Sequence, residues 1–280
     1  MNIKDIQIRD PFVVLEQGLY YLFGSTDKDI WKSRGVGFDV YTNTGDLTEW
    51  DGPFAAFRPA ADFWAEINFW APEVYVYNGA YVMFATFKPK TGRRGTAVLK
   101  SESLLGPFTP WSDGPVTPCE WECLDGTLYI DSAGNPFMVF CHEWQQVKDG
   151  EICAMPLSKD LRKAAGEPLL LFRASEAPWV RELAGRDAGN FVTDGPFVWR
   201  TDAGELVLLW SSFGEEGYCI GLARSKSGTI AGPWEQSPEP LFAKDGGHGM
   251  LFRSKEGELY LTIHRPNQSP DERAIFIRHG

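Results

Sequence analysis

The segment YYLFGS, at residues 20–25, is the first of five similar stretches that decide the fold. Each combines residues that favour β-strands with an aromatic or large apolar residue and then small or polar ones. The other copies are YVMFAT at 81–86, FMVFCH at 137–142, VLLWSS at 207–212 and YLTIHR at 260–265. Because each copy has the length of one strand, the chain is predicted to repeat a β-unit five times.

Two further patterns flank each copy. A second apolar segment follows it, and in three units a Gly-Pro turn comes next, at residues 52–53, 106–107 and 232–233. Glycine and proline fix turn geometry, so a strand–turn–strand unit is being repeated. A polar residue beside Pro or Gly precedes each copy. We refer to these five as the anchor residues: Asp10, Glu73, Asp125, Asp194 and His248.

Five such units predict an all-β chain, a five-bladed β-propeller that forms a single domain over residues 1–280. The anchor residues are expected to form a ring at one mouth of the channel, because each would occupy the same place in its blade. A β-sandwich, which also has many short strands, is the alternative. The fifth unit ends at its third strand, so residues 3–8 are expected to supply an outer strand. Helical turns are expected in the insertions 58–68 and 175–190.

Composition supports a packed core and excludes several classes of protein. The 280 residues are 43% hydrophobic and 14% aromatic, which excludes a disordered chain. Lys and Arg number 27 against 38 Asp and Glu, a net charge of −11, so neither nucleic acid nor an anionic membrane is an expected partner. The five scattered cysteines fit a reducing compartment, and Cys119 and Cys123 lack the second pair that zinc would need.

The N-terminal residues lack the long apolar stretch of a signal peptide, and no apolar run is long enough to span a bilayer. A cytoplasmic protein is therefore expected. The alternative is a secreted protein whose leader has been removed.

Four acidic anchor residues around one channel favour a catalytic function. Two carboxylates across a pocket suit cleavage of a glycosidic bond, and a third raises the pKa of the acid. Aromatic residues near the anchors, whose faces could pack on sugar rings, are Trp64, Phe69, Trp70, Trp121, Trp144 and Trp179. The alternative interpretations are turn capping for each acid and core packing for each aromatic residue.

At these residues the sequence resembles the family-43 glycoside hydrolases, which are five-bladed propellers acting on arabinose- and xylose-containing polysaccharides. The matching stretches are RDPFV from residue 9, WAPEV from 70, LDGTLYIDSAG from 124, TDGPFVW from 193 and GHGMLF from 247. The resemblance implies that Asp10 is the general base, Asp125 tunes and orients the acid, and Asp194 holds the general-acid position. It also implies an inverting reaction, and Trp70 and Glu73 near the sugar. The family requires no cofactor. In some members a calcium or other ion lies beside the residue that matches His248.

This sequence departs from the family pattern at two positions. Asp194 stands where the family has Glu, and its side chain is one methylene shorter; Glu143 or Glu122 is an alternative acid. Gly126 replaces a proline. From the repeat alignment, His142 and Glu143 are also candidate site residues, ranked below the anchor residues. Arg265 is expected to point toward the same mouth of the channel and bind sugar hydroxyls.

The leading prediction is an inverting glycosidase that cleaves α-L-arabinofuranosidic or β-D-xylosidic bonds in plant-type oligo- or polysaccharides. An alternative is a carbohydrate-binding propeller whose hydrolysis is impaired because Asp194 replaces Glu. A third interpretation is a scaffold for protein partners, as in other propellers. Carboxylates inside the channel argue against the scaffold.

Overall fold

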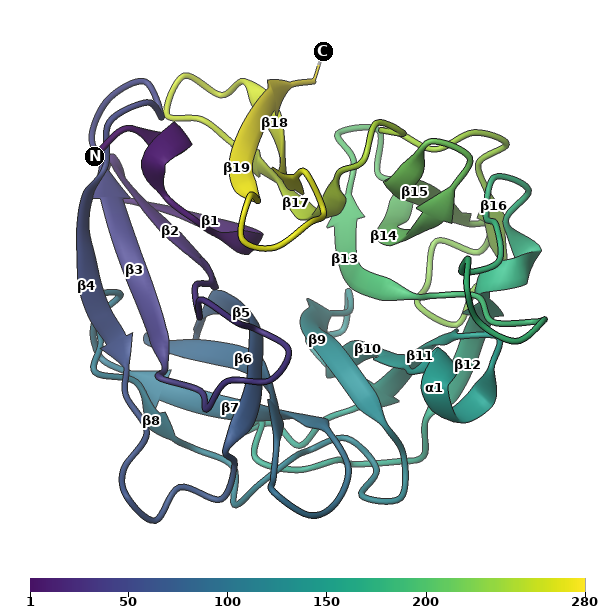
Figure 1. The fold of residues 1–280 in the computed structure, drawn as a ribbon, viewed down its shortest axis with the longest axis horizontal. Helices are drawn as coiled ribbons and strands as arrows, with labels where there is room; N and C mark the ends of the chain where they lie inside the picture. Colours follow the sequence, from purple (N-terminus) through teal and green to yellow (C-terminus); the bar gives the residue numbers. More distant parts are fainter. Residues whose placement is uncertain (280) are drawn as a thin grey trace.

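The structure, a computed structural model, consists of five β-sheets arranged as blades around a central channel (Figure 1). It describes residues 1–279; Gly280, the last residue of the single domain expected over 1–280, lies outside the described residues. The prediction of a five-bladed propeller is confirmed. No helix among the described residues is both long and apolar enough to cross a membrane.

Each blade is an antiparallel meander whose first strand lines the channel. The first blade contains β1 (Arg9–Glu16), β2 (Leu19–Ser25), β3 (Phe38–Asn43) and β4 (Asp51–Phe57). The second contains β5 (Ile67–Tyr77), β6 (Ala80–Lys88), β7 (Gly95–Ser101) and β8 (Thr109–Pro110). The third contains β9 (Cys123–Ile130), β10 (Pro136–His142), β11 (Glu151–Pro156) and β12 (Leu169–Arg173). The fourth contains β13 (Asp194–Arg200), β14 (Leu206–Gly214), β15 (Gly217–Ser225) and β16 (Trp234–Gln236). The fifth contains β17 (Gly247–Arg253), β18 (Leu259–Arg265) and β19 (Arg273–Arg278).

The five repeated segments are the second strands of the five blades, β2, β6, β10, β14 and β18. Their apolar residues pack between neighbouring blades. Between the first and second blades, for example, Phe57, Phe69 and Phe87 are buried together, and the rings of Phe69 and Phe87 meet edge to face at 4.9 Å. Burial of such large aromatic side chains is the main driving force that holds one blade to the next.

Each innermost strand has a break in its pairing register near its start, and a residue at that break has a positive φ angle. These five residues are Asp10 (53°), Ala71 (47°), Asp125 (56°), Gly195 (49°) and His248 (43°). β5 has two such breaks, with Asn68 at the first and Ala71 at the second. The left-handed conformation is unfavourable for residues other than glycine, so it persists only where its surroundings stabilise it. We refer to these five positions as the bulge ring.

The backbone N–H groups of the bulge ring donate hydrogen bonds to the neighbouring blade. Four of them reach a side chain on the second strand of the preceding blade. These bonds are Ala71 to Ser25 Oγ (2.8 Å), Asp125 to Thr86 Oγ1 (2.8 Å), His248 to Ser211 Oγ (2.8 Å) and Asp10 to His264 Nδ1 (3.2 Å). The fifth, Gly195, donates instead to Asp125 Oδ2 at 3.0 Å. In four blades a polar residue that is last or next to last in the repeated segment therefore binds the next blade.

The bulge ring corrects one sequence expectation. Asp10, Asp125 and His248 do occupy equivalent places, but Ala71 and Gly195 hold that place in the second and fourth blades. Glu73 lies two residues beyond it and Asp194 one residue before it. The sequence alignment erred because the extra residue in each bulge shifts the register by an amount that a Gly or Pro neighbour does not reveal.

The expected outer strand at residues 3–8 is also wrong. Residues 3–5 form the 3₁₀ helix η1 (Ile3–Asp5), and the fifth blade has three strands. Ile3 N–H bonds to Thr48 O at 2.9 Å, which draws this segment to the outside of the first blade and away from pairing with β19. The first and fifth blades meet through apolar packing, such as Tyr20 against Phe252, and through separate hydrogen bonds, such as Ile8 N–H to Glu272 O at 3.3 Å.

The helical turns follow the sequence expectation only in part. Residues 58–68 contain no helix, and the insertion 175–190 only overlaps the end of η2 (Ala174–Glu176). A short helix that was not expected, α1 (Trp144–Val147), follows β10.

The bulge ring predicts a difference between two adjacent serines of β14, both fully buried. Ser211→Ala removes the acceptor of the His248 N–H and leaves that donor unpaired, so the free energy of unfolding should fall by about 1–3 kcal/mol. Ser212 Oγ has no hydrogen-bond partner among the described residues, so Ser212→Ala should be close to neutral. Chemical denaturation of both variants measures this difference. Equal losses would contradict a specific role for the Ser211 bond.

Candidate active site

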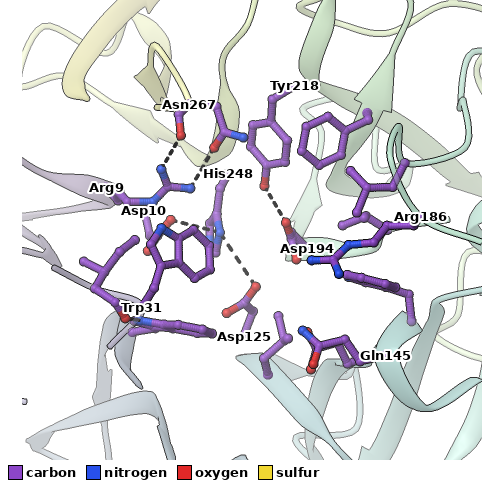
Figure 2. A pocket seen from close by; sticks show the side chains of 18 residues that line it. Arg9, Asp10, Trp31, Asp125, Gln145, Arg186, Asp194, Tyr218, His248 and Asn267 are labelled. Carbon is purple, nitrogen blue, oxygen red and sulfur yellow. Dashed lines mark hydrogen bonds and ion pairs between the residues drawn. The ribbon is translucent and has the colours of Figure 1, made fainter. Parts of the chain in front are cut away.

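A cavity of about 360 Å³ opens where the innermost strands of the blades begin (Figure 2). Asp10, Asp125, Asp194 and His248 all line it. The four come from β1, β9, β13 and β17, so the ring of blades brings together side chains that are far apart in sequence. The expectation of acids gathered at one mouth of the channel holds for these residues.

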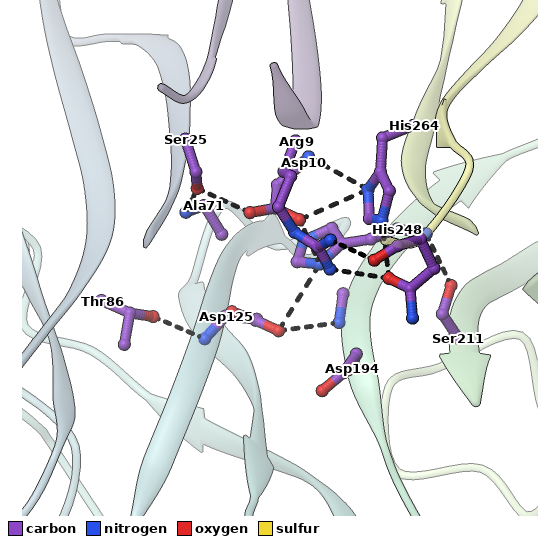
Figure 3. Close-up of polar contacts among 12 residues, drawn as sticks. Arg9, Asp10, Ser25, Ala71, Thr86, Asp125, Asp194, Ser211, His248 and His264 are labelled. Carbon is purple, nitrogen blue, oxygen red and sulfur yellow. Dashed lines mark hydrogen bonds and ion pairs between the residues drawn. The ribbon is translucent and has the colours of Figure 1, made fainter. Parts of the chain in front are cut away.

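Asp10 is buried and held from two sides (Figure 3). Ser25 Oγ donates to its Oδ2 at 2.6 Å, and His248 Nδ1 lies 3.1 Å from its Oδ1. Burial alone would raise the pKa of Asp10, but His248, the positive charge of Arg9 and the bond from Ser25 together lower it. Asp10 is therefore ionised at neutral pH, as a general base must be.

The tautomer of His264 follows from its contacts. Its Nδ1 accepts the Asp10 N–H, so its proton is on Nε2, which donates to Asn267 Oδ1 at 3.0 Å. Burial lowers the pKa of His264 to about 3, and the nearby Arg9 charge adds to this. His264 is therefore neutral and holds Asp10 in place by accepting its backbone N–H.

Asp125 and Asp194 form the other half of the site. Asp125 Oδ2 accepts the Gly195 N–H at 3.0 Å and lies 3.7 Å from His248 Nδ1, while Asp194 Oδ2 accepts the Tyr218 hydroxyl at 3.0 Å. Loss of solvation in the cavity raises the pKa of Asp194 to about 7, and the charges of Glu143 and Asp10 contribute. Burial and the charge of Asp194 raise the pKa of Asp125 well above its usual range.

The pKa values of the three carboxyls are thus shifted in different directions. The pKa of Asp10 is lowered, whereas that of Asp194 is raised to about 7 and that of Asp125 is raised well above its usual range. A pair of carboxyls whose pKa values are pushed apart can act as base and acid in one reaction.

Two further expected site residues, Trp70 and Glu143, also line the cavity. Arg94 joins them: its Nη1 pairs with Glu143 Oε2 at 2.6 Å, and its guanidinium lies 4.6 Å from the Trp70 ring centre. Glu143 and Arg94 are both buried. Because Glu143 is already paired with a cation, it is poorly placed to replace Asp194 as the acid. The other alternative, Glu122, does not line the cavity.

The structure does not bring Glu73, His142 or Arg265 to the cavity wall. Glu73 is buried and hydrogen-bonded to the Tyr75 hydroxyl, and burial raises its pKa to about 8. His142 stacks on Trp121 at 4.1 Å. Arg265 is exposed, and its Nε donates to Lys244 O at 2.7 Å, so the expectation that it points to this mouth is wrong.

The remaining aromatic candidates divide between cavity and core. Trp144 lines the cavity. Phe69 and Trp179 are buried, and Trp64 packs against the core, as the core-packing alternative held.

Several cavity residues were missed by the sequence analysis. They are Arg9, Trp31, Gln145, Arg186, Tyr218 and Asn267 (Figure 2). Arg9 stands within the quoted RDPFV motif, and Tyr218 directly precedes the second apolar segment of its unit. Their positions in the motif and the repeat could therefore have identified both as site residues. Trp31 and Arg186 lie in loops that do not repeat between blades, so no pattern marked them.

The side chains around His248 give little support to the ion expected beside it. No group of three or more His, Cys, Asp or Glu side chains within residues 1–279 is arranged to hold a metal ion. His248 offers one nitrogen, whereas calcium takes six to eight oxygen ligands. The ion stays a prediction, and no step proposed below depends on it.

Comparison with known proteins identifies the family. The model of the glycosyl hydrolases family 43 matches residues 3–279. The chain belongs to this family. A family-43 enzyme is a glycoside hydrolase, so the broad activity predicted from the carboxylates is confirmed.

Relatives of this family-43 chain include arabinan-degrading enzymes. The structure of an endo-arabinase from Bacteroides thetaiotaomicron VPI-5482 is 42% identical, covers 100% of this chain and 96% of its own, and superposes with a TM-score of 0.92. An exo-1,5-α-L-arabinanase from a bovine ruminal metagenomic library, 20% identical with a TM-score of 0.68 over 99% of this chain and 95% of its own, shares the fold.

A further relative is the extracellular endo-α-(1→5)-L-arabinanase 1 of Bacillus subtilis (strain 168). It is 24% identical over 155 residues, which are 50% of this chain and 45% of that protein. The match therefore spans less than half the length of that relative.

The bond from Tyr218 to Asp194 predicts a pH effect. It stabilises the ionised carboxylate, so Tyr218→Phe should raise the pKa of Asp194. If Asp194 must be protonated to act, the alkaline limb of the pH profile of kcat/KM should move to higher pH. Tyr20→Phe is the control, because Tyr20 is a buried tyrosine outside the cavity whose hydroxyl accepts the Lys255 N–H. A Tyr218→Phe limb that stays in place or moves to lower pH would count against Asp194 as the acid.

Proposed function

We propose that this family-43 enzyme hydrolyses α-L-arabinofuranosidic bonds of arabinan or arabino-oligosaccharides, with inversion of configuration. The observation that carries the chemistry is one cavity lined by three carboxyls, with the pKa lowered at Asp10 and raised at Asp125 and Asp194. The choice of arabinose is supported by the endo-arabinase that is 42% identical over the whole chain.

In the proposed reaction, Asp10 accepts a proton from a water molecule as that water attacks the anomeric carbon. Asp194 donates its proton to the leaving glycosidic oxygen, so the bond to the leaving sugar breaks as the bond to water forms. Asp125 accepts the N–H of Gly195, the residue after Asp194, and so holds the start of β13 that carries the acid. An inverting mechanism predicts that the Asp10 and Asp194 carboxyls lie about 6.5–9.5 Å apart, leaving room for the water.

The shorter acid does not by itself favour the carbohydrate-binding alternative. The Tyr218 hydroxyl orients the Asp194 carboxyl, and a pKa of about 7 suits a proton donor at neutral pH. These features support a working acid. A protein that only binds carbohydrate does not need a carboxyl whose pKa is raised to about 7.

The location of the protein is a separate question. The Bacillus subtilis relative is described as extracellular, which gives no support to the cytoplasmic location expected from the sequence. We therefore favour the alternative, a secreted enzyme acting on polymeric or partly degraded arabinan.

The roles of the two carboxyls predict different responses to the leaving group. Asp10→Asn should lower kcat/KM by about 10²–10⁴-fold on every substrate, since the base is always needed. Asp194→Asn should cause a similar loss on an arabino-oligosaccharide but a much smaller one on a dinitrophenyl arabinofuranoside, whose leaving group needs no proton. The measurement is kcat/KM for both variants on both substrates. Equal losses for Asp194→Asn on the two substrates would remove its role as acid.

The stereochemical outcome is predicted independently. Proton NMR during hydrolysis by the wild-type enzyme should show the β-anomer of arabinose at the new reducing end first, because single displacement inverts the α-linkage. First appearance of the α-anomer would contradict the mechanism.

A further inference from the structure

The loop between β2 and β3 carries one tryptophan that is unlike the others. Trp31 is 54% exposed, whereas the other ten tryptophans are all less exposed. It nevertheless lines the active-site cavity. A large aromatic face held open to solvent at a sugar site is a surface on which the apolar face of a sugar ring could pack.

The position of Trp31 is fixed by hydrogen bonds from two sides. Within the loop, Asp29 Oδ1 accepts the N–H groups of Trp31 and Lys32, both at 3.1 Å. From the second blade, Trp70 Nε1 donates to Ile30 O at 2.7 Å. Loop and blade are joined again where Gly35 N–H donates to Glu66 O at 2.8 Å. A backbone held in this way presents its side chain with little ordering cost on binding.

The indole itself is held by two neighbours. The Trp70 ring meets Trp31 edge to face at 5.2 Å, and the Arg9 guanidinium lies 5.6 Å from the ring centre. Arg9 is in turn fixed by Asn267, whose backbone and side-chain oxygens accept its Nη1 and Nη2 at 2.6 and 2.7 Å. These contacts leave half of the indole exposed.

Trp31 stands next to the reacting position and not at it. Arg9, which directly precedes Asp10 in β1, is the residue that contacts the indole. Figure 2 shows Trp31 and Arg9 on one side of the cavity and Arg186 on the other, with Asp125 and Asp194 between them. A sugar held by the three carboxyls would therefore have its neighbour in the substrate chain near Trp31.

We propose that Trp31 is the platform for a sugar residue adjacent to the one whose bond is cleaved, so that this loop makes the enzyme prefer oligosaccharides over single-sugar glycosides. The proposal rests on the proposed glycosidase function. It assigns a binding role to Trp31, with Arg9 and Asp29 as residues that position it.

The test compares two substrates, a nitrophenyl α-L-arabinofuranoside with one sugar and a linear arabinotetraose. Trp31→Ala should lower kcat/KM for the tetrasaccharide by roughly ten- to a hundredfold, and by at least tenfold more than for the single-sugar substrate. Trp31→Phe, which keeps an aromatic face, should recover most of this loss. Val36→Ala is the matched control, because Val36 lies in the same loop, is 63% exposed and does not line the cavity.

Three results would overturn the proposal: equal losses on both substrates, no loss on the tetrasaccharide, or a Trp31→Phe variant no better than Trp31→Ala. Activity on the single-sugar substrate also reports whether each variant is folded. If the wild type cleaves xylotetraose and not arabinotetraose, the proposed substrate is wrong, and the same comparison with xylosides decides the role of Trp31. If the wild type neither cleaves nor binds either tetrasaccharide by calorimetry, both proposals fall.

Discussion

The hydrogen bonds that join one blade to the next are the constraint on which the rest of this structure depends. Each starts from the backbone N–H of a left-handed residue, which is strained in the four that are not glycine. All five end on a polar side chain of the preceding blade, four of them on its second strand. The strain is tolerated because the bulge turns the backbone N–H toward the preceding blade, which the regular pairing of a straight strand does not allow. The same backbone turn also directs the side chains of Asp10, Asp125 and His248 into the cavity. The alignment of neighbouring blades and the geometry of the site therefore both depend on this backbone turn.

The fifth bond of the ring shows how closely fold and chemistry are joined. Gly195 donates to the carboxyl of Asp125, so a carboxyl that lines the cavity also links the third blade to the fourth. Desolvation sets the protonation states of all three acids, and only Asp10 has enough cationic and hydrogen-bonding neighbours to overcome it. The ability to act as base or acid is thus decided by what surrounds each carboxyl, since all three are aspartates.

The sequence predicts most of what repeats in this protein and little of what does not. The strands YYLFGS and YVMFAT, and the acids Asp10 and Asp125, were found because the same pattern returns in each blade. Glu73 was misplaced because a bulge adds a residue that composition does not record. Arg265 was misplaced because the repeat fixes where a residue stands in its strand, but not which neighbour its long side chain finds. Trp31 sits in a loop of one blade only, so its position required the three-dimensional contacts with Trp70 and Arg9.

The three-stranded fifth blade and the short helix η1 leave the ring without a shared strand where its first and last blades meet. That seam is held by apolar packing, such as the rings of Tyr20 and Phe252, and by hydrogen bonds, one of which joins the Asp10 N–H to His264. The two ends of the chain therefore build neighbouring parts of one site: β1 carries Asp10, while β17 and β18 carry His248 and His264 beside it. Asp10 has its neighbours only when both ends of the chain are in place.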